Sequence, residues 1–342
     1  MGPAFAVAGR RRAGRRGYVG LLSNRFPDAE KYLKMAIELA PGDKDANLFL
    51  GDCYIRQDKF SLAVPRWQAA GREVYAKWFA AVRGEPYRIH GDIARLPWQQ
   101  TDPFPLVEAS INGGPPKRFT FYTGAGWLGM SSKVAEAGLS AVASQKIDYL
   151  GGTAWQYFGV LDSFKLGGIE LRNIPVEWSE TDTPEEPNDG IIGTWVFYHL
   201  LTIFDYAGRS LILRRRTPET AREARADATR AGAEPLPLWL AREHMLHSRG
   251  SIAGSGTRVV AVPIGGTGEI AAGMSGDTAE QLGIRLGNAA AKEVYCYANP
   301  SQSLAPFGFD VLAHFSHSFY KPYNVTLDFT DMNLYIARGK AT

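Results

Sequence analysis

Hydrophobic and polar positions divide the chain into a first part with a helical repeat and a longer part with the alternation of β-strands. In the first part, small and large apolar positions recur 34 residues apart, as the pairs Gly17 and Gly51, Ala29 and Ala63, Leu33 and Trp67, and Ala36 and Ala70. Small residues at such positions let antiparallel helices approach closely, and the larger ones fill the space between them. We therefore expect helices over residues 17–83.

The spacing of this repeat is that of the tetratricopeptide repeats, which the segment resembles. Two copies are fewer than the three or so that such repeats need, and residues 73–82 have the sequence of a capping helix. The repeat predicts either a concave surface for a protein partner or a structural appendage, and we favour the appendage. Residues 84–104 are rich in proline and turn residues, which predicts a linker.

From residue 105 the sequence predicts short strands joined by glycine and proline turns, and hence a mostly β fold. Phe119 and Phe121 alternate with polar residues, so one face of their strand is expected to be buried. Residues 110–121 (SINGGPPKRFTF) resemble residues 251–262 (SIAGSGTRVVAV). Three short motifs that follow residue 122 return in the same order 144 residues later.

These repeats predict two tandem copies of a β lobe, over residues 105–214 and 236–338. A charged, alanine-rich segment over residues 215–235 separates them and is expected to be a linker with some helix.

The order of motifs in the first copy resembles the lobe of the aspartic peptidases. A hydrophobic strand runs into Thr-Gly-Ala in FTFYTGA (residues 119–125), and a later strand runs through Ile-Ile-Gly into a helix in DGIIGTWVF (residues 189–197). The whole chain resembles the bacterial retropepsin-like proteins that join tetratricopeptide repeats to two fused lobes. The resemblance implies a fold of two aspartic-peptidase β lobes and a family activity of peptide-bond hydrolysis.

The chemistry that this resemblance implies needs two carboxylates about 3 Å apart, one from an Asp-Thr-Gly turn of each lobe, which share a proton. The two turns of this chain are Tyr122-Thr123-Gly124 and, from the repeat, Gly266-Thr267-Gly268. Both Thr-Gly pairs are present and both aspartates are absent. Because a phenol has a pKa near ~10 and Gly266 has no side chain, the sequence predicts little or no general acid–base catalysis. Tyr122 is also expected to push the lobes apart or to plug the cleft.

Other residues of the motifs define the support of the turns and two substitute acids. The hydrophobic pair before glycine that supports the first turn is Ile191, Ile192 and Gly193, and its counterpart in the second lobe is either residues 311–313 or residues 314–316. Two further carboxyl groups could replace the missing pair. Glu269 follows the second turn, and Asp189 precedes the Ile-Ile-Gly motif.

Two rival kinds of site have weaker support in the sequence. His244 and His247, and again His314 and His317, are spaced as H-x-x-H, which would bind zinc if both segments were helical. The first segment has the pattern of a strand, in which residues three apart face opposite sides, so we expect no metal site and no cofactor. The Gly-x-Ser-x-Gly motif of serine hydrolases is absent.

Composition and charge narrow the partners. Hydrophobic residues make up 45% of the chain, charged residues 21%, and the net charge of +3 gives no reason to expect a nucleic acid. No apolar run reaches the 18 or so residues of a membrane span. The two cysteines, Cys53 and Cys296, cannot form a disulfide framework and fit a reducing compartment. The start of the chain has its apolar residues before its arginines, the reverse of a secretory signal, so the cytoplasm is the expected location.

The sequence thus leaves function in two classes. The first is an aspartic-peptidase homologue that has lost catalysis and binds a peptide or protein between its lobes. The alternative is an active aspartic endopeptidase that uses substitute acids. A decayed copy without function would carry the same substitutions.

Overall fold

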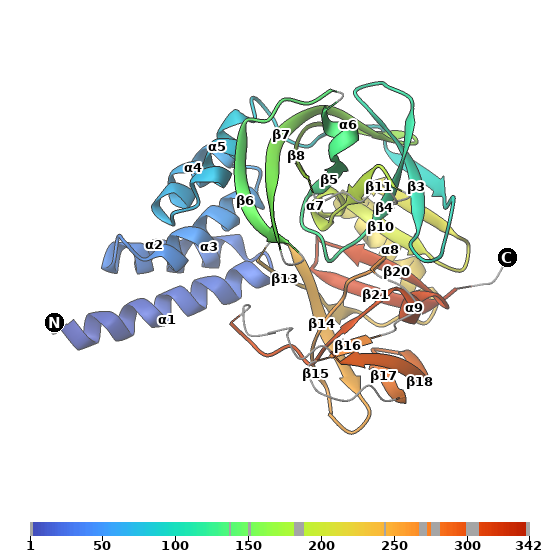
Figure 1. Cartoon of the computed structure of the whole chain (residues 1–342). Coiled ribbons are helices and arrows are strands. Elements are labelled where there is room, and N and C mark those ends of the chain that lie inside the picture. Colours follow the sequence, from blue (N-terminus) through green and yellow to red (C-terminus); the bar gives the residue numbers. More distant parts are fainter. Residues whose placement is uncertain are drawn as a thin grey trace. The chain divides into compact units, whose positions relative to one another are not determined.

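The computed structural model describes residues 3–136, 138–149, 152–180, 188–242, 244–266, 272–274, 281–298 and 308–339 (Figure 1). The helices are α1 (Pro3–Leu22), α2 (Phe26–Leu39), α3 (Lys44–Ile55), α4 (Phe60–Ala69), α5 (Glu73–Ala81), α6 (Ser132–Glu136), α7 (Thr194–Tyr198), α8 (Pro218–Arg230) and α9 (His317–Tyr320).

The strands of the N-terminal half are β1 (Arg88–His90), β2 (Ile93–Pro97), β3 (Leu106–Ile111), β4 (Pro116–Phe121), β5 (Leu128–Ser131), β6 (Ala143–Tyr149), β7 (Gly152–Leu166), β8 (Ile169–Ser179) and β9 (Gly190–Ile192). The later strands are β10 (Leu200–Asp205), β11 (Ser210–Arg215), β12 (Leu236–Pro237), β13 (Trp239–Ala241), β14 (Met245–Ile252), β15 (Arg258–Ala261), β16 (Ala272–Met274), β17 (Gln281–Leu286), β18 (Ala289–Ala298), β19 (Ala313–Phe315), β20 (Tyr323–Asp328) and β21 (Asn333–Arg338). The predicted class, mostly β behind N-terminal helices, is confirmed.

The chain forms two compact units. The first comprises Met1–Arg88, Met130–Asp162 and Arg172–Pro184, and the second comprises Ile89–Gly129, Ser163–Leu171 and Glu185–Thr342. Both Thr123 and the described part of the second predicted turn belong to the second unit. The candidate site can therefore be described within a single unit.

In the first unit, glycines allow the close approach of helices at two positions that are 34 residues apart. A Cβ added at Gly17 would lie 2.5 Å from Leu33 Cγ, and one added at Gly51 would lie 2.5 Å from Trp67 Nε1. The same pair of positions in the repeat therefore makes the same contact in both copies. This geometry is the reason why the sequence keeps a glycine at each place.

An aromatic cluster connects the helices of the first unit to its strands. The Trp67 ring packs edge-on against Phe79, with ring centroids 4.8 Å apart. On the next turn of α5, Trp78 is fully buried, packs on Phe158 of β7 and donates a hydrogen bond of 2.7 Å from Nε1 to Gly159 O. The helical segment is thus fixed to β7 by both apolar and polar contacts.

The second unit contains a six-stranded sheet with the order β12-β21-β20-β10-β11-β2. Its central antiparallel pair is β10 and β20, in which Ile203 lies opposite Thr326. In the flanking hairpins Ile203 pairs with Ile212 and Thr326 pairs with Tyr335. The last hairpin of each predicted lobe therefore occupies matching places on either side of the centre of this sheet.

Matching registers also occur in the other strands of the second unit. In the hairpin of β3 and β4, Ala109 lies opposite Lys117, and in that of β14 and β15, Gly250 lies opposite Arg258. Each of these strands then has a parallel neighbour. Thr120 pairs with Ile191 of β9, and Ala261 pairs with His314 of β19.

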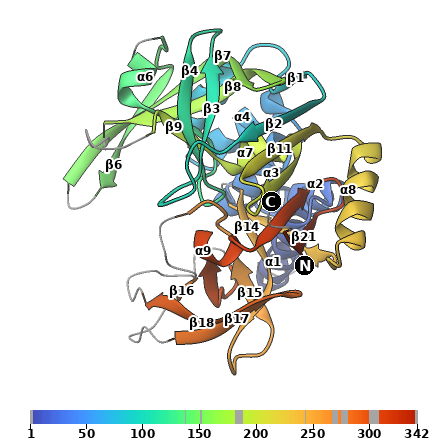
Figure 2. The same cartoon turned by 90° about the vertical axis from the view of Figure 1, so that its right-hand side faces the viewer.

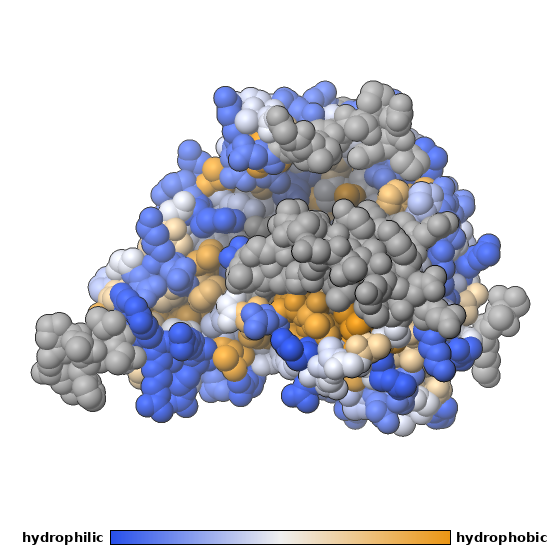
Figure 3. Space-filling view, turned by 60° about the horizontal axis from the view of Figure 1, so that its bottom comes forward, coloured by the Kyte–Doolittle hydropathy of each residue, from blue (hydrophilic) through white to orange (hydrophobic). Residues whose placement is uncertain are grey.

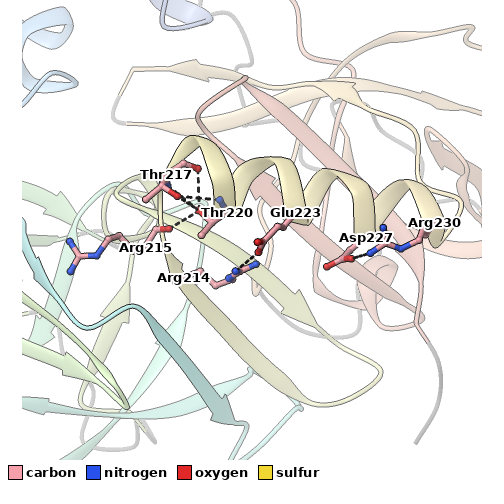
Figure 4. Close-up of polar contacts among 7 residues, drawn as sticks. All are labelled: Arg214, Arg215, Thr217, Thr220, Glu223, Asp227 and Arg230. Carbon is pink, nitrogen blue, oxygen red and sulfur yellow. Dashed lines mark hydrogen bonds and ion pairs between the residues drawn. The ribbon is translucent and has the colours of Figure 1, made fainter.

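The charged segment that follows β11 contains a regular helix, α8. Thr217 caps it, because its hydroxyl accepts the N–H of Thr220 at 3.1 Å while the Thr220 hydroxyl accepts the N–H of Thr217 (Figure 4). Glu223 accepts a hydrogen bond of 2.6 Å from Arg214, and Asp227 pairs with Arg230 (Figure 4). The helix lies beside β21 (Figure 2). Its buried alanines form the packing face, and they are Ala221, Ala224 and Ala228.

The described surface is of the ordinary kind for a globular protein. Figure 3 shows one face on which hydrophilic residues predominate and apolar residues lie between them. Among the described residues, no helix has the length and apolar character needed to cross a membrane.

Gly51→Ala tests the helix packing of the first unit. The new Cβ would overlap the Trp67 indole, which cannot move away because Tyr75 and Phe79 pack against it, so we expect a loss of about 1–3 kcal/mol in unfolding free energy. Gly14→Ala is the matched control, since a Cβ there meets no described atom within 4 Å and alanine favours a helix by up to about 1 kcal/mol. Equal unfolding midpoints for the two variants in denaturant would contradict this packing.

Candidate functional site

The first predicted turn follows β4 and is held by the neighbouring parallel strand. The N–H of Tyr122 donates to the carbonyl oxygen of Ile192 at 3.0 Å. Gly193 then lies so close to the turn that an added Cβ would be 2.7 Å from Gly126 O. Together with Ile191, which pairs with Thr120, these residues surround the turn as predicted from the Ile-Ile-Gly motif.

Thr123 forms the central hydrogen bonds of the site. Its buried hydroxyl donates to Val262 O at 2.8 Å and accepts the N–H of Ile264 at 2.7 Å. Its own N–H donates to Ile264 O at 2.9 Å. A threonine of the first turn is thus joined by three hydrogen bonds to the segment that follows β15.

Helix α7 holds the first turn from the other side. The hydroxyl of Thr194 donates to Thr123 O at 2.9 Å, and the N–H of Thr194 donates to Ala125 O at 2.9 Å. The N–H of Trp195 donates to Gly126 O, also at 2.9 Å. The turn is therefore fixed along its whole length, which pre-organises whatever side chain residue 122 carries.

The aromatic ring of Tyr122 occupies the centre of this arrangement. A Cβ added at Gly124 or at Gly266 would lie 2.6 Å from Cε2 of the ring in each case. The ring thus fills the space over both glycines. Burial raises the pKa of the Tyr122 phenol above its usual value, so the phenol is an even weaker base here than in water.

The second predicted turn is described only in part. Gly266 is described, and it offers no acid. Thr267, Gly268 and the substitute acid Glu269 lie outside the described residues, so their roles stay predictions. Of the two alternatives for the second hydrophobic motif, residues 314–316 match in place, because His314 pairs with β15 as Ile191 pairs with β4.

Asp189 has a structural position at the start of β9. Its carboxylate accepts the N–H of Arg118 at 2.8 Å, and its own N–H donates to Arg118 O at 2.6 Å. It precedes β9 at the end opposite to Ile192, which a strand rise of ~3.3 Å per residue places roughly 10 Å away along the strand. Its contacts close the β4–β9 pair, and the carboxylate is engaged away from the Tyr122 ring.

A polar chain that the motifs did not indicate lies behind the second turn. The N–H of Gly265 donates to the buried hydroxyl of Tyr206 at 3.2 Å, and this hydroxyl lies 3.2 Å from Nδ1 of His317. On the other side of the ring, His317 Nε2 is 3.6 Å from a carboxylate oxygen of Asp102, which also pairs with Lys321 at 2.5 Å. This pair with Lys321 lowers the pKa of Asp102, while burial lowers that of His317. Because these partners lie about a hundred residues apart, spacing in the sequence gave no signal of the chain.

The histidines of the two H-x-x-H pairs lie in different surroundings. His244 packs on the indole of Trp195 with ring centroids 3.6 Å apart, and His247 packs on Phe309. Burial lowers the pKa of His247 to about 4. Within the part of the chain that the structure describes, no group of three or more His, Cys, Asp or Glu side chains could hold a metal ion.

Comparisons with known proteins agree on the fold. A family model described as aspartyl protease matches residues 107–196, which include the first turn and the Ile-Ile-Gly motif. No curated protein matches the chain. Among solved structures, the aspartic proteinase from Irpex lacteus is similar with a TM-score of 0.52 and 12% identity, over 73% of this chain and 98% of that chain. This likeness shows that the chain has an aspartic-peptidase-like fold.

Thr123→Val tests the central hydrogen bonds. Valine keeps the shape but removes the hydroxyl, which leaves Val262 O and the Ile264 N–H without this partner, so we expect a loss of about 2–4 kcal/mol in unfolding free energy. Thr120→Val is the matched control, since the buried Thr120 hydroxyl has no hydrogen-bond partner among the described residues. Thr123→Ser should recover most of the loss. Similar unfolding midpoints for the two valine variants would show that the hydroxyl contributes nothing.

His247 predicts an acid-dependent loss of stability. Its pKa is about 4 in the folded protein and near ~6.5 in the unfolded chain, so the unfolded state binds a proton first as pH falls. The stabilisation present above pH ~6.5 is therefore lost between pH ~6.5 and ~4, by about 3 kcal/mol in total. Unfolding free energies measured across this range should depend less on pH in His247→Leu. The control His90→Gln, which changes an exposed histidine, should keep the original slope.

Proposed function

We propose that this chain is an aspartic-peptidase homologue without catalytic activity that binds a peptide or protein segment through the surface around its first turn. The observation that carries the proposal is the Tyr122 ring, which fills the space over Gly124 and Gly266. In an aspartic peptidase this space belongs to the carboxylates and the water between them.

The hydrogen bonds of the turn support retention of a defined surface. Thr123 keeps contacts of 2.7–2.9 Å with the segment that follows β15, and Thr194 holds its carbonyl group. A chain that had lost all constraint on this region would not need these buried polar contacts to be satisfied, since each unsatisfied one costs about 1–3 kcal/mol. The combination of a preserved frame and an absent acid favours binding over turnover.

The ligand class follows from the fold and from the chemistry of the turn. Aspartic peptidases hold extended peptides, and an aromatic ring in place of the carboxylates offers apolar contact and a hydroxyl group to such a chain. The helical repeat of residues 17–83 could receive a separate protein partner. The tetratricopeptide assignment and the lobe boundaries at residues 105–214 and 236–338 belong to the same proposal.

The alternative is an active aspartic endopeptidase with substitute acids. Glu269 is the stronger of the two candidates, because the contacts of Asp189 with Arg118 engage its carboxylate at the far end of β9. General acid–base catalysis contributes about 10²–10⁴-fold per reaction, so a working substitute would be evident in a cleavage assay.

The test incubates the full chain with a mixture of peptides from pH 3 to pH 8 and detects products by mass spectrometry. We expect no cleavage above the background. Cleavage that is lost in Glu269→Gln or in Asp189→Asn would establish the alternative and contradict the proposal.

Binding is measured with the same peptides by fluorescence anisotropy. Because burial of an aromatic side chain contributes about 1.5–3 kcal/mol, Tyr122→Ala should weaken the binding of a retained peptide about tenfold or more. The control Tyr32→Ala changes a tyrosine of α2 in the helical segment and should leave the affinity unchanged. Equal affinities in both variants would mean that the peptide does not contact the turn.

A further inference from the structure

The strand registers allow the residues of the two lobes to be matched without reference to sequence similarity. The pair Ala109 and Lys117 is matched by Gly250 and Arg258, which lie 141 residues later in both strands (109 to 250 and 117 to 258). The same shift carries the parallel contact of Thr120 to that of Ala261 (120 to 261). β4 and β15 therefore correspond residue by residue up to their ends.

One more step along the chain reaches the turns themselves. Phe121 ends β4, and its match is Val262. The next three matches are Tyr122 with Pro263, Thr123 with Ile264, and Gly124 with Gly265. This match is three residues earlier than the one that the recurrence of Thr-Gly suggests.

The hydrogen bonds of Thr123 support the earlier match. Its hydroxyl contacts Val262 O and the N–H of Ile264, which are the two neighbours of Pro263. The hydroxyl therefore faces the backbone on both sides of Pro263. Gly266 and the residues after it take no part in these contacts.

Gly265 has the properties that a tight crossing of two turns requires. Its φ of +78° lies in the left-handed region, and an added Cβ would overlap the carbonyl oxygen of Phe121 and lie 2.8 Å from that residue's Cδ2. Glycine is thus required at position 265 by the first turn itself.

The shift of three residues has a definite location. After the turns, Gly129 lies against Ile191 and Gly273 pairs with His314, which is a separation of 144 residues (129 to 273). The second lobe therefore contains three more residues than the first between Gly265 and Gly273. This insertion explains why the Thr-Gly of residues 267 and 268 has the spacing of the later motif.

We infer that Pro263 occupies the acid position of the second lobe and Ile264 its threonine position, so that the second turn is Pro263-Ile264-Gly265. The inference rests on the proposed function, since it specifies how the second acid was lost. Gly266 then has a different role, because its missing side chain leaves room for the Tyr122 ring.

The experiment compares Tyr122→Asp/Pro263→Asp with Tyr122→Asp/Gly266→Asp, each beside its single variants. Carboxyl pKa values are measured by ¹³C NMR, without substrate. Two carboxylates that face each other cannot both ionise, so in the first double variant one pKa should rise by at least about one unit above its value in the single variant. The second double variant should show the pKa values of its single variants.

Coupling in the variant with Asp at position 266, or in neither variant, would overturn the inference. Cleavage of peptides by the unaltered chain would instead overturn the proposed lack of activity, and it would leave the carboxyl titrations as they are. The two failures are therefore distinguishable.

A single substitution gives a second measurement if a double variant does not fold. At the threonine position, a hydroxyl introduced by Ile264→Thr should reach Phe121 O, as the Thr123 hydroxyl reaches Val262 O. Its unfolding midpoint should therefore equal that of Ile264→Val, which has the same shape. The control Val260→Thr places a hydroxyl in buried β15 and should lower the midpoint by several degrees. A fall for Ile264→Thr as large as that of the control would contradict the match.

Discussion

The hydroxyl of Thr123 is the group on which the described site depends. It connects the turn after β4 to the backbone on both sides of Pro263, and it does so where water is excluded. A buried hydroxyl that donates once and accepts once leaves little freedom in the relative position of the two segments. The orientation of Tyr122, the crossing at Gly265 and the support from Thr194 all follow from this fixed contact.

Much of the first lobe could be predicted because its motifs are local. Alternation around Phe119 and Phe121 indicates a strand with a buried face, and a parallel neighbour with Ile191 and Ile192 follows from the short apolar run before glycine. The second turn could not be located in this way. Pro263 and Ile264 share no side-chain chemistry with their counterparts, and their contacts with Thr123 involve backbone atoms that sequence does not distinguish.

Two other features show the same limit. The chain of groups from Asp102 through His317 and Tyr206 to Gly265 joins positions that are distant in sequence, so only the fold brings them together. The segment after β11 was expected to be mainly a linker because of its charges. Its cap at Thr217 and its buried alanines make it a packed helix, since the period of the alanines matters more than the number of charges.

The fit of the Tyr122 ring to Gly124 and Gly266 constrains the history of the site. A Cβ at either glycine would lie 2.6 Å from the ring, so a tyrosine could enter only a chain that already had glycine at both positions. Once the tyrosine is present, every other residue at position 266 is excluded by the ring. The substitutions therefore have a necessary order, and a lineage that has completed them can return only by first replacing the tyrosine.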